Sequence, residues 1–542
     1  MVPGSRQGAG TNFPDSLSSF RKGPMEALDL ARWQFGITTV YHFIFVPLTI
    51  GLSLLVAIMN TRAVFAKDPV RKDAWMRMTK FFGGMLIVNF GIGVATGLVQ
   101  EFQFGMNWSE YARFVGDVFG APLALEGLAA FFLESVFLGL WIFGWGRLPE
   151  KIHLLTIWAV ALGTTASAYF IIAANSFMQH PVGAMLNPET GRAELDPSQG
   201  SILSVLTNIT ALAAFPHVVS GAWLVAAAFV TGVASWHMVR HHRTARKLGL
   251  ETTEGARHQE AARELHRPVV RFGVLAMFVA AIVLVISGDA QAKLMFQQQP
   301  MKMASAEAHC DTATDVPFSI LTVGGPNAFS VDCSGVSHLI EIPYVTSMLA
   351  TNDPHAELQG VDDLNAQYKE QFGKTALDIH GNEVEVDYRP NLFVTYWSFR
   401  LMMGLAAFSG ILAFWALWVT RGKGENARTT GSRLFQWFAV LSIPMPFFAN
   451  SAGWVFTEIG RQPWVVHPNP DDPTIRLMTL QGVSSHPSWM VITSLVAFTV
   501  VYGVLAVVWF ELMRRAALKG VPLATKDPET AELDTPTLTF DY

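Results

Sequence analysis

Nine long apolar segments constrain the fold of this chain more than any other feature of its sequence. A helix needs about 20 residues to cross the hydrocarbon core of a bilayer. Spanning strands would be shorter and would alternate apolar with polar residues, so these segments are predicted to be helices. The expected fold is all-α: a polytopic membrane protein with about nine transmembrane helices. The segments lie near residues 35–60, 79–100, 120–144, 153–177, 209–237, 269–289, 393–419, 433–456 and 489–512.

The composition agrees with a membrane protein and excludes one class of partner. Hydrophobic residues make up 51% of the 542 residues and charged residues only 15%, whereas soluble domains usually carry about 25% charged residues. The net charge of −5 is small, and no basic groove or aromatic-basic alternation indicates a nucleic-acid partner. The lipid bilayer is therefore the expected surrounding of the chain.

Basic residues gather in the connections after the first, fifth and seventh apolar segments and in the tail after the ninth. The positive-inside rule places such connections in the cytoplasm. The amino terminus is therefore expected outside and the carboxyl terminus in the cytoplasm. The basic residues include Arg62, Lys67, Arg71, Lys72, Arg240, Arg243, Arg246, Arg421, Lys423, Arg514 and Arg515.

The chain divides into five expected parts. Residues 1–24 are a flexible extension, because they lack the apolar core of a signal peptide. Residues 516–542 are a polar, disordered cytoplasmic tail. Between them lie six transmembrane helices in 25–289, an extracytoplasmic loop in 290–392 and three further helices in 393–515.

The extracytoplasmic loop holds both cysteines of the chain, Cys310 and Cys333. Two cysteines in one loop outside the cytoplasm favour a disulfide, and a pair of free thiols is the alternative. Their spacing excludes a CxxC redox motif.

Several ionisable residues lie within or at the edge of the apolar segments. A charge near the bilayer centre costs roughly 2.5–3.5 kcal/mol on insertion scales, so residues of this kind are expected to serve ligands, protons or electrons. They are His42, Glu126, Glu134, His217, Arg400 and Glu458.

His217 and Met402 are predicted to lie at similar depth. Both segments that carry them enter from outside, and the two residues lie about eight and nine residues in, which is roughly 12–14 Å at 1.5 Å per residue. They can then meet across a flat cofactor, and His with Met is an axial pair typical of low-spin electron-transfer haem. From the residues alone, a core methionine and a hydrogen-bonded histidine remain open alternatives.

Two further groups of acids and bases point to proton or cofactor chemistry. Glu126 and Glu134 are separated by about 2.2 helical turns, so they share roughly one face, about 12 Å apart. This suits a proton path toward the outer side, and pairing of each acid with another helix is the alternative. Arg461 follows Glu458 and can neutralise a cofactor propionate or Glu458 itself, or belong to an interfacial Arg/Trp belt.

The chain resembles subunit I of the cytochrome bd-type quinol oxidases. The resemblance covers about residues 25 to 515, and GRQPW and the GAPLA–EG–FFLES block are its most specific motifs. The matching phrases are YHFIFVPLTIG (41–51), GVATGLVQEFQFGMNWSEY (93–111), VGDVFGAPLALEGLAAFFLES (115–135), FPHVVSGAW (215–223), QPMKMASAEA (299–308), FRLMMG (399–404) and EIGRQPW (458–464).

The resemblance implies three haems: two haem b and one haem d, or a third haem b in its place. His217 and Met402 match the axial ligands of the low-spin haem b, and Arg400 matches a basic residue near it. His42 matches the axial histidine of a high-spin haem, taken as haem d, and Glu458 the ligand of the high-spin haem b. Which of the two high-spin haems each residue ligates stays open.

The remaining site residues also follow from the resemblance. Glu126 matches a carboxylate at the high-spin haem pair, and Glu134 matches an acid of the proton path below it. Arg461 and Trp454 are expected to contact the cofactors. Within QPMKMASAEA, Lys302 and Glu307 fall at the spacing of the family's quinol-oxidising loop. Without the resemblance, these two would be interpreted as solvated loop charges.

The implied activity is that of a terminal respiratory oxidase in a bacterial cytoplasmic membrane. Quinol is oxidised at the outer face, and O2 is reduced to water at the high-spin haem pair with protons from the cytoplasm, which generates a proton motive force. The expected partners are a homologous second subunit and often a small single-helix subunit. Two alternatives remain: an oxidase of the same fold with haem b only, and an ion or proton transporter that uses Glu126, Glu134 and Arg400.

Overall fold

Nine long helices form the body of the protein in the computed structural model, which describes residues 26–323, 333 and 335–523. In this described part of the chain, each of the nine is long and apolar enough to cross a membrane, so the predicted fold class is confirmed. In chain order they comprise α1 (Ala27–Val64), α2 (Pro69–Met106), α3 (Ser109–Leu125) with η1 (Glu126–Phe131) and α4 (Phe132–Phe143), α5 (Glu150–Gln179), α6 (Ile202–Leu206) with α7 (Ile209–Leu248), α8 (Thr253–Glu260) with η3 (Ala261–His266) and α9 (Arg267–Gln298), α13 (Leu392–Val419), α14 (Arg433–Leu441) with α15 (Met445–Ile459), and α17 (Ser488–Lys519).

The helices run past several of the predicted ends. α9 continues to Gln298 instead of ending near 289, and Asp289 and Lys293 pair one turn apart in this polar extension of the helix. α17 continues to Lys519, so the start of the predicted disordered tail is helical. The predicted extension 1–24 and the rest of that tail lie outside the described residues.

α7 also extends further than predicted, to Leu248. His241 and His242 therefore lie on a helix, beyond the apolar segment predicted to end near 237, and both are half-buried. The helix end was missed because the apolar pattern ends before the helix does.

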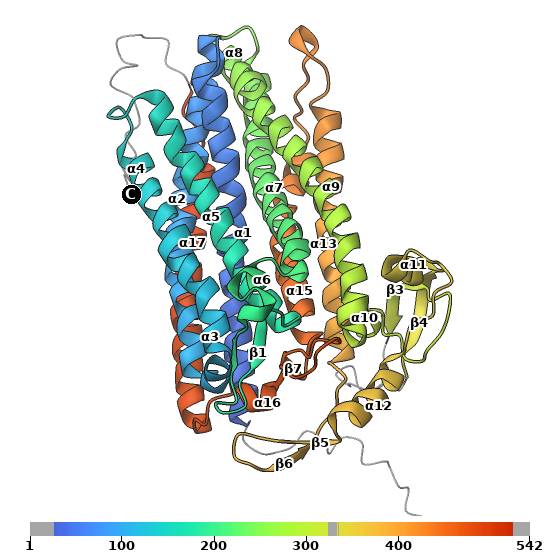
Figure 1. Ribbon diagram of the computed structural model, residues 1–542. Helices are drawn as coiled ribbons and strands as arrows, with labels where there is room; N and C mark the ends of the chain where they lie inside the picture. The colour runs from blue at the N-terminus through green and yellow to red at the C-terminus, as the bar shows by residue number, and fades with distance from the viewer. Residues whose placement is uncertain (1–25, 324–332, 334, 524–542) are drawn as a thin grey trace, which may run out of the picture.

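α7 is the central helix of the bundle, and α17 lies at its edge. In the most apolar stretch of the α6–α7 segment, 89% of the residues are buried. In the most apolar stretch of α17, only 11% are buried. Figure 1 shows α7 between α5 on one side and α9 and α13 on the other. The exposed face of α17 is apolar and suits lipid or a partner subunit; it carries Val496, Val500, Val504, Val507 and Phe510.

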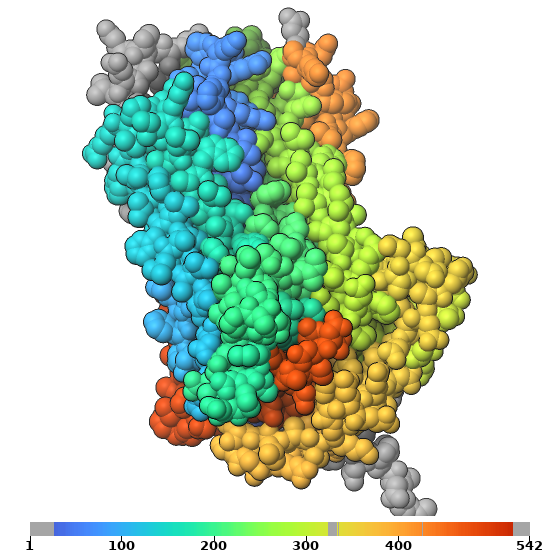
Figure 2. Space-filling model, viewed as in Figure 1, coloured from blue at the N-terminus to red at the C-terminus, as the bar shows by residue number. Residues whose placement is uncertain are grey.

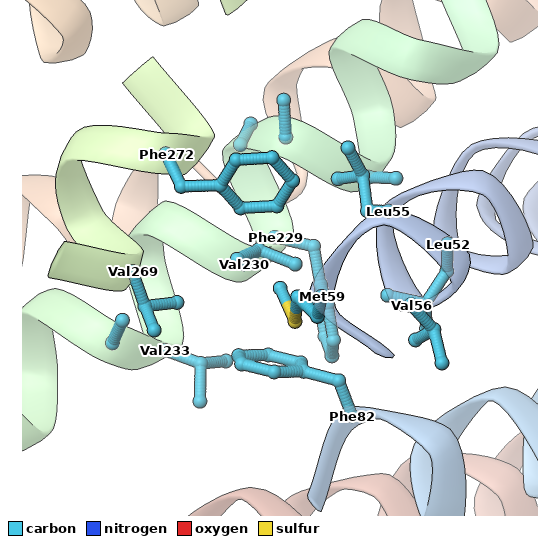
Figure 3. Close-up of a cluster of buried hydrophobic side chains, with 14 of the residues drawn as sticks. Leu52, Leu55, Val56, Met59, Phe82, Phe229, Val230, Val233, Val269 and Phe272 are labelled. Carbon is cyan, nitrogen blue, oxygen red and sulfur yellow. The ribbon is translucent and has the colours of Figure 1, made fainter. Parts of the chain in front are cut away.

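Small residues set the approach of the helices. A Cβ atom on Gly51 of α1 would lie 2.3 Å from the carbonyl oxygen of Ala222 and 2.6 Å from Cβ of Ala226, both on α7. Interfaces made of small residues are typical of membrane helices. Lipid tails are as apolar as the side chains, so association of the helices depends on close packing. Beside such contacts, large side chains from four helices interdigitate (Figure 3): Met59, Phe82, Phe229 and Phe272.

A polar insertion follows α9 and occupies one end of the bundle (Figures 1 and 2). Cys310 and Cys333 form a disulfide within it, with their Cα atoms 5.8 Å apart. Two short hairpins from other parts of the chain lie at the same end: β1 (Ala184–Leu186) with β2 (Ala193–Leu195), and β7 (Trp464–Val466) with β8 (Leu477–Met478). The insertion comprises α10 (Pro300–Glu307), the antiparallel strands β3 (Phe318–Val323) and β4 (Ser337–Ile342), α11 (Val345–Thr351), α12 (Val361–Phe372), and the antiparallel strands β5 (Thr375–Leu377) and β6 (Glu383–Glu385).

Candidate functional site

His42 is held by a neighbouring helix in one tautomer. Its Nδ1 lies 2.8 Å from Oγ1 of Thr96 on α2. That hydroxyl also lies 3.1 and 3.0 Å from the carbonyl oxygens of Ile92 and Gly93, so its single proton goes to the backbone. With that proton on the backbone, Thr96 accepts a hydrogen bond from Nδ1–H of His42. The Nε2 atom keeps its lone pair, which is the form of histidine that binds a metal.

His217 repeats this arrangement on α7. Its Nδ1 lies 3.1 Å from Oγ of Ser287 on α9, and Ser287 donates its own proton to the carbonyl of Val283 at 2.6 Å. Nδ1 of His217 is therefore the donor, and Nε2 carries the lone pair. An outer hydrogen bond of this kind also orients the ring of a ligand histidine.

Three helical glycines make room for the candidate ligands. A Cβ on Gly97 would lie 3.2 Å from Cε1 of His42, and one on Gly288 would lie 3.3 Å from Cε1 of His217. A Cβ on Gly453 would lie 2.8 Å from the sulfur of Met402. These glycines have no distinguishing signal in the sequence, because a helical glycine is also typical of ordinary membrane-helix packing.

Glu458 and Arg461 lie in a polar cluster at the insertion end of the bundle. Glu458 accepts hydrogen bonds from Nδ2 of Asn175 at 3.0 Å and Nε2 of Gln179 at 3.5 Å, and it pairs with Nη2 of Arg461. Arg461 is 3% exposed, yet its Nε and Nη1 have no hydrogen-bond partner in the described part of the chain. These two buried nitrogens can donate hydrogen bonds to a further carboxylate.

Lys302 belongs to the same cluster. Its Nζ donates to Oε1 of Gln179 at 2.7 Å, and it is 5% exposed. Burial lowers the pKa of Lys302 to about 7; the nearby cation of Arg461 lowers it further and the carboxylate of Glu458 opposes the shift. The interpretation of Lys302 as a solvated loop charge is therefore wrong.

Glu307 is buried on another side of α10, against Arg400 of α13. Nη2 of Arg400 lies 2.5 Å from the Glu307 carboxylate. Its Nε and Nη1 donate to the carbonyl oxygens of Ser319 and Ala306, so every guanidinium nitrogen has a protein partner. Burial raises the pKa of Glu307 to about 7, against the opposing effect of Arg400. Glu307 is thus no solvated loop charge either.

The structure therefore separates two residues that the sequence motif joins. Lys302 faces Gln179 and lies near Glu458 and Arg461, whereas Glu307 faces Arg400. Five residues of α-helix turn a side chain through about 500°, so these two point away from each other on α10. Trp454, on α15, lies beside Phe35 and Phe43 of α1, with ring centroids 6.2 and 5.8 Å away.

A π-helical turn aligns Glu126 with Glu134. In a regular α-helix, eight residues leave the second side chain about 80° past the first. The π segment η1 begins at Glu126, and its i→i+5 bonds accommodate one extra residue. That residue absorbs about 100° of rotation and leaves the two carboxylates within about 20° of each other. Glu126 accepts a hydrogen bond from Oγ of Ser167 at 2.7 Å, and Glu134 is buried against Gly163.

Comparison with known proteins identifies the family. The family model described as cytochrome bd terminal oxidase subunit I matches residues 30–521. The chain belongs to this family. The predicted family and its enzyme class, a bd-type quinol oxidase, are therefore confirmed. Membership implies haem cofactors, quinol as the substrate and a second subunit.

Several relatives in this family cover most of the chain. Cytochrome bd ubiquinol oxidase subunit 1 of Bacillus subtilis (strain 168) is 37% identical over 94% of this chain and 99% of its own length. Cytochrome bd-II ubiquinol oxidase subunit 1 of Escherichia coli (strain K12) is 34% identical over 81% of this chain and 88% of its own. The bd oxidase structure from Geobacillus thermodenitrificans superimposes with a TM-score of 0.73 at 25% identity, covering 91% of this chain and 99% of that one.

The donors present in this family member fit haem. Two histidines carry an Nε2 lone pair, and a thioether lies in a pocket made by a glycine. These are ligand types that bind haem iron. The Nε and Nη1 groups of buried Arg461, which have no partner among the described residues, suit a propionate.

Proposed function

We propose that this chain oxidises quinol and supports the four-electron reduction of O2 to water. The observation that carries this proposal is the matched pair of histidines whose Nδ1 is fixed by a hydroxyl and whose Nε2 is left for iron. Haem, when bound, supplies the one-electron transfer and the oxygen chemistry. The protein supplies ligands, buried carboxylates and a water-poor surrounding.

The proposed cofactors are two haem b and one haem d. His217 and Met402 would hold the low-spin haem b, while His42 and Glu458 would hold the high-spin haems. The buried donors of Arg461 support a place for a haem propionate beside Glu458. Trp454, among the aromatic rings of α1, would line the cofactor region.

Quinol oxidation is assigned to the insertion end. Glu307 is suited to accept a hydroxyl proton from quinol, because its pKa of about 7 allows both protonation states near neutral pH. Arg400 holds the carboxylate in position and ties α10 and β3 to α13. Lys302 would act from the other side of α10, where it connects the insertion to the Glu458–Arg461 cluster.

The pH dependence of quinol oxidation tests the role of Glu307. A proton acceptor must be ionised, so kcat/KM for quinol should fall by about tenfold per pH unit below pH 7 and level off above it. Glu307→Gln should lower kcat/KM and remove this dependence. Glu383→Gln, at an exposed position of the same insertion, is the control and should keep the wild-type profile. The same profile in Glu307→Gln would exclude Glu307 as the acceptor.

Glu134 and Glu126 are proposed to deliver protons for oxygen reduction. Their alignment through the π turn supports a path along one face of the helix. With the amino terminus outside, as the basic connections predict, Glu134 lies on the cytoplasmic side of Glu126. Protons consumed from the cytoplasm and quinol protons released outside would together build a proton motive force.

Glu134→Gln should slow oxygen consumption by about 100-fold, the scale on which a positioned proton donor contributes. The haem spectrum should be unchanged, because Glu134 is not a proposed ligand. Glu150→Gln at the exposed start of α5 should have no effect on oxygen consumption. Wild-type oxygen consumption in Glu134→Gln would remove this residue from the path.

A further inference from the structure

Three histidines gather at the end of the bundle opposite the insertion. His237 and His241 are one turn apart on α7, and His266 ends the π-helical segment η3. One possible ligand atom from each lies within 4.8 Å of the corresponding atoms of the other two. Two histidines at i and i+4 share one helix face, as they do in helical zinc motifs.

The histidine of η3 is buried without any polar partner. His266 is 1% exposed, and neither of its ring nitrogens has a hydrogen-bond partner in the described part of the chain. A buried polar group left without a hydrogen bond destabilises the fold. Because a neutral imidazole has one lone pair and one N–H, this ring has an unused metal-binding atom within the cluster.

Each of the other two rings has one nitrogen in an outer hydrogen bond. Nε2 of His237 lies 2.7 Å from the carbonyl oxygen of Ala517 and must be its donor. Nδ1 of His241 lies 2.7 Å from Nδ1 of His258. An imidazole that binds a metal through one nitrogen commonly uses the other in such an outer hydrogen bond.

The local backbone also marks this place. η3 is one of two π-helical segments in the described part of the chain, and the other begins at Glu126. π turns are frequent at functional sites, because the extra residue changes the direction of the side chains around it. Here the π turn ends at His266, whose ring stacks on those of His237 and His241 of α7.

We propose that His237, His241 and His266 form a binding site for one divalent transition-metal ion of the Zn²⁺ class. Neutral imidazoles suit Zn²⁺, Cu²⁺ and Ni²⁺, whereas Mg²⁺ and Ca²⁺ prefer oxygen ligands. The three-histidine group includes no carboxylate in the described part of the chain. The ion would connect α7 with η3 and, through Ala517, with the end of α17.

The test uses the intact, haem-loaded oxidase complex, purified with a histidine-free affinity tag and treated with a chelator. Zn²⁺ is then titrated, and bound zinc is counted against haem iron by elemental analysis. One zinc per chain is expected, with zinc-edge absorption showing nitrogen neighbours at about 2.0–2.1 Å. His241→Asn and His266→Gln should each weaken binding at least about tenfold.

His242→Asn is the matched control, because this neighbour bonds Thr429 and lies outside the cluster. It should bind zinc like the wild type. The haem spectrum of each variant establishes that the bundle is folded. Absence of stoichiometric binding of Zn²⁺, Cu²⁺ and Ni²⁺ to the folded wild type would overturn the site. Equal zinc binding in His241→Asn, His266→Gln and the wild type would do the same.

Discussion

Replacing Met402 with leucine is expected to abolish the spectrum of the low-spin haem and to lower quinol oxidase activity by about 100-fold or more. Even outer partners of a metal site contribute 10- to 100-fold, and a thioether ligand has no substitute in leucine. The volume of the side chain is nearly conserved, so the packing against Gly453 should survive. The measurement is the reduced-minus-oxidised spectrum beside oxygen consumption.

Met403→Leu provides the control for this experiment. Met403 is the next residue on α13 and is 37% exposed, so the same chemical change there should leave the spectrum and the activity unaltered. An unchanged low-spin haem signal in Met402→Leu would remove Met402 from the proposed ligands. An equal loss of the haem spectrum and of oxygen consumption in both variants would indicate that α13 tolerates neither substitution. The proposed ligand role of Met402 would then lose its support.

Arg400→Met is expected to destabilise the complex by about 3–5 kcal/mol, because it removes one partner of a buried ion pair and the donor to the carbonyl oxygens of Ser319 and Ala306. The side chains of the pair are only 7% and 2% exposed. The variant should show a lower Tm and little quinol oxidation. The double variant with Glu307→Leu should regain part of the stability, since no carboxyl group is then left buried without its partner. It should stay inactive toward quinol, since the proposed proton acceptor is lost.

Arg389→Met gives the comparison within the insertion. Arg389 pairs with Asp387 and Asp362, whose side chains are 36% and 45% exposed, and exposed pairs contribute about 0–1 kcal/mol. Its effect on Tm should therefore be small. If Arg400→Met lowered Tm no more than Arg389→Met, the bonds of Arg400 to α10 and β3 would not stabilise the insertion as proposed.

The fold was largely predictable because membrane helices have a strong sequence signal. All nine apolar segments correspond to helices, since a backbone in lipid must satisfy its own hydrogen bonds. Helix ends were less predictable: α7 and α9 continue into polar sequence, where the apolar pattern no longer reports the helix. The family resemblance, and with it the enzyme class, was also evident from the sequence.

The environment of the candidate site was harder to predict. Lys302 and Glu307 resemble loop charges in the sequence, and only the tertiary structure buries them beside Gln179 and Arg400. The hydroxyls that fix the two histidines come from other helices, so no local spacing reveals them. The π turn at Glu126 likewise has no simple sequence signal, although it decides how the two carboxylates align.

The reduced-minus-oxidised optical spectrum of the purified complex, with haem extraction from the same sample, decides whether the protein holds the three proposed haems. We expect a chlorin signal of haem d beside haem b in a ratio of about one to two, which corresponds to one low-spin haem b and a high-spin pair of haem b and haem d. Haem b alone would contradict the haem d assignment and favour an oxidase of the same fold that uses only haem b. A folded complex without haem would contradict the proposed ligands altogether.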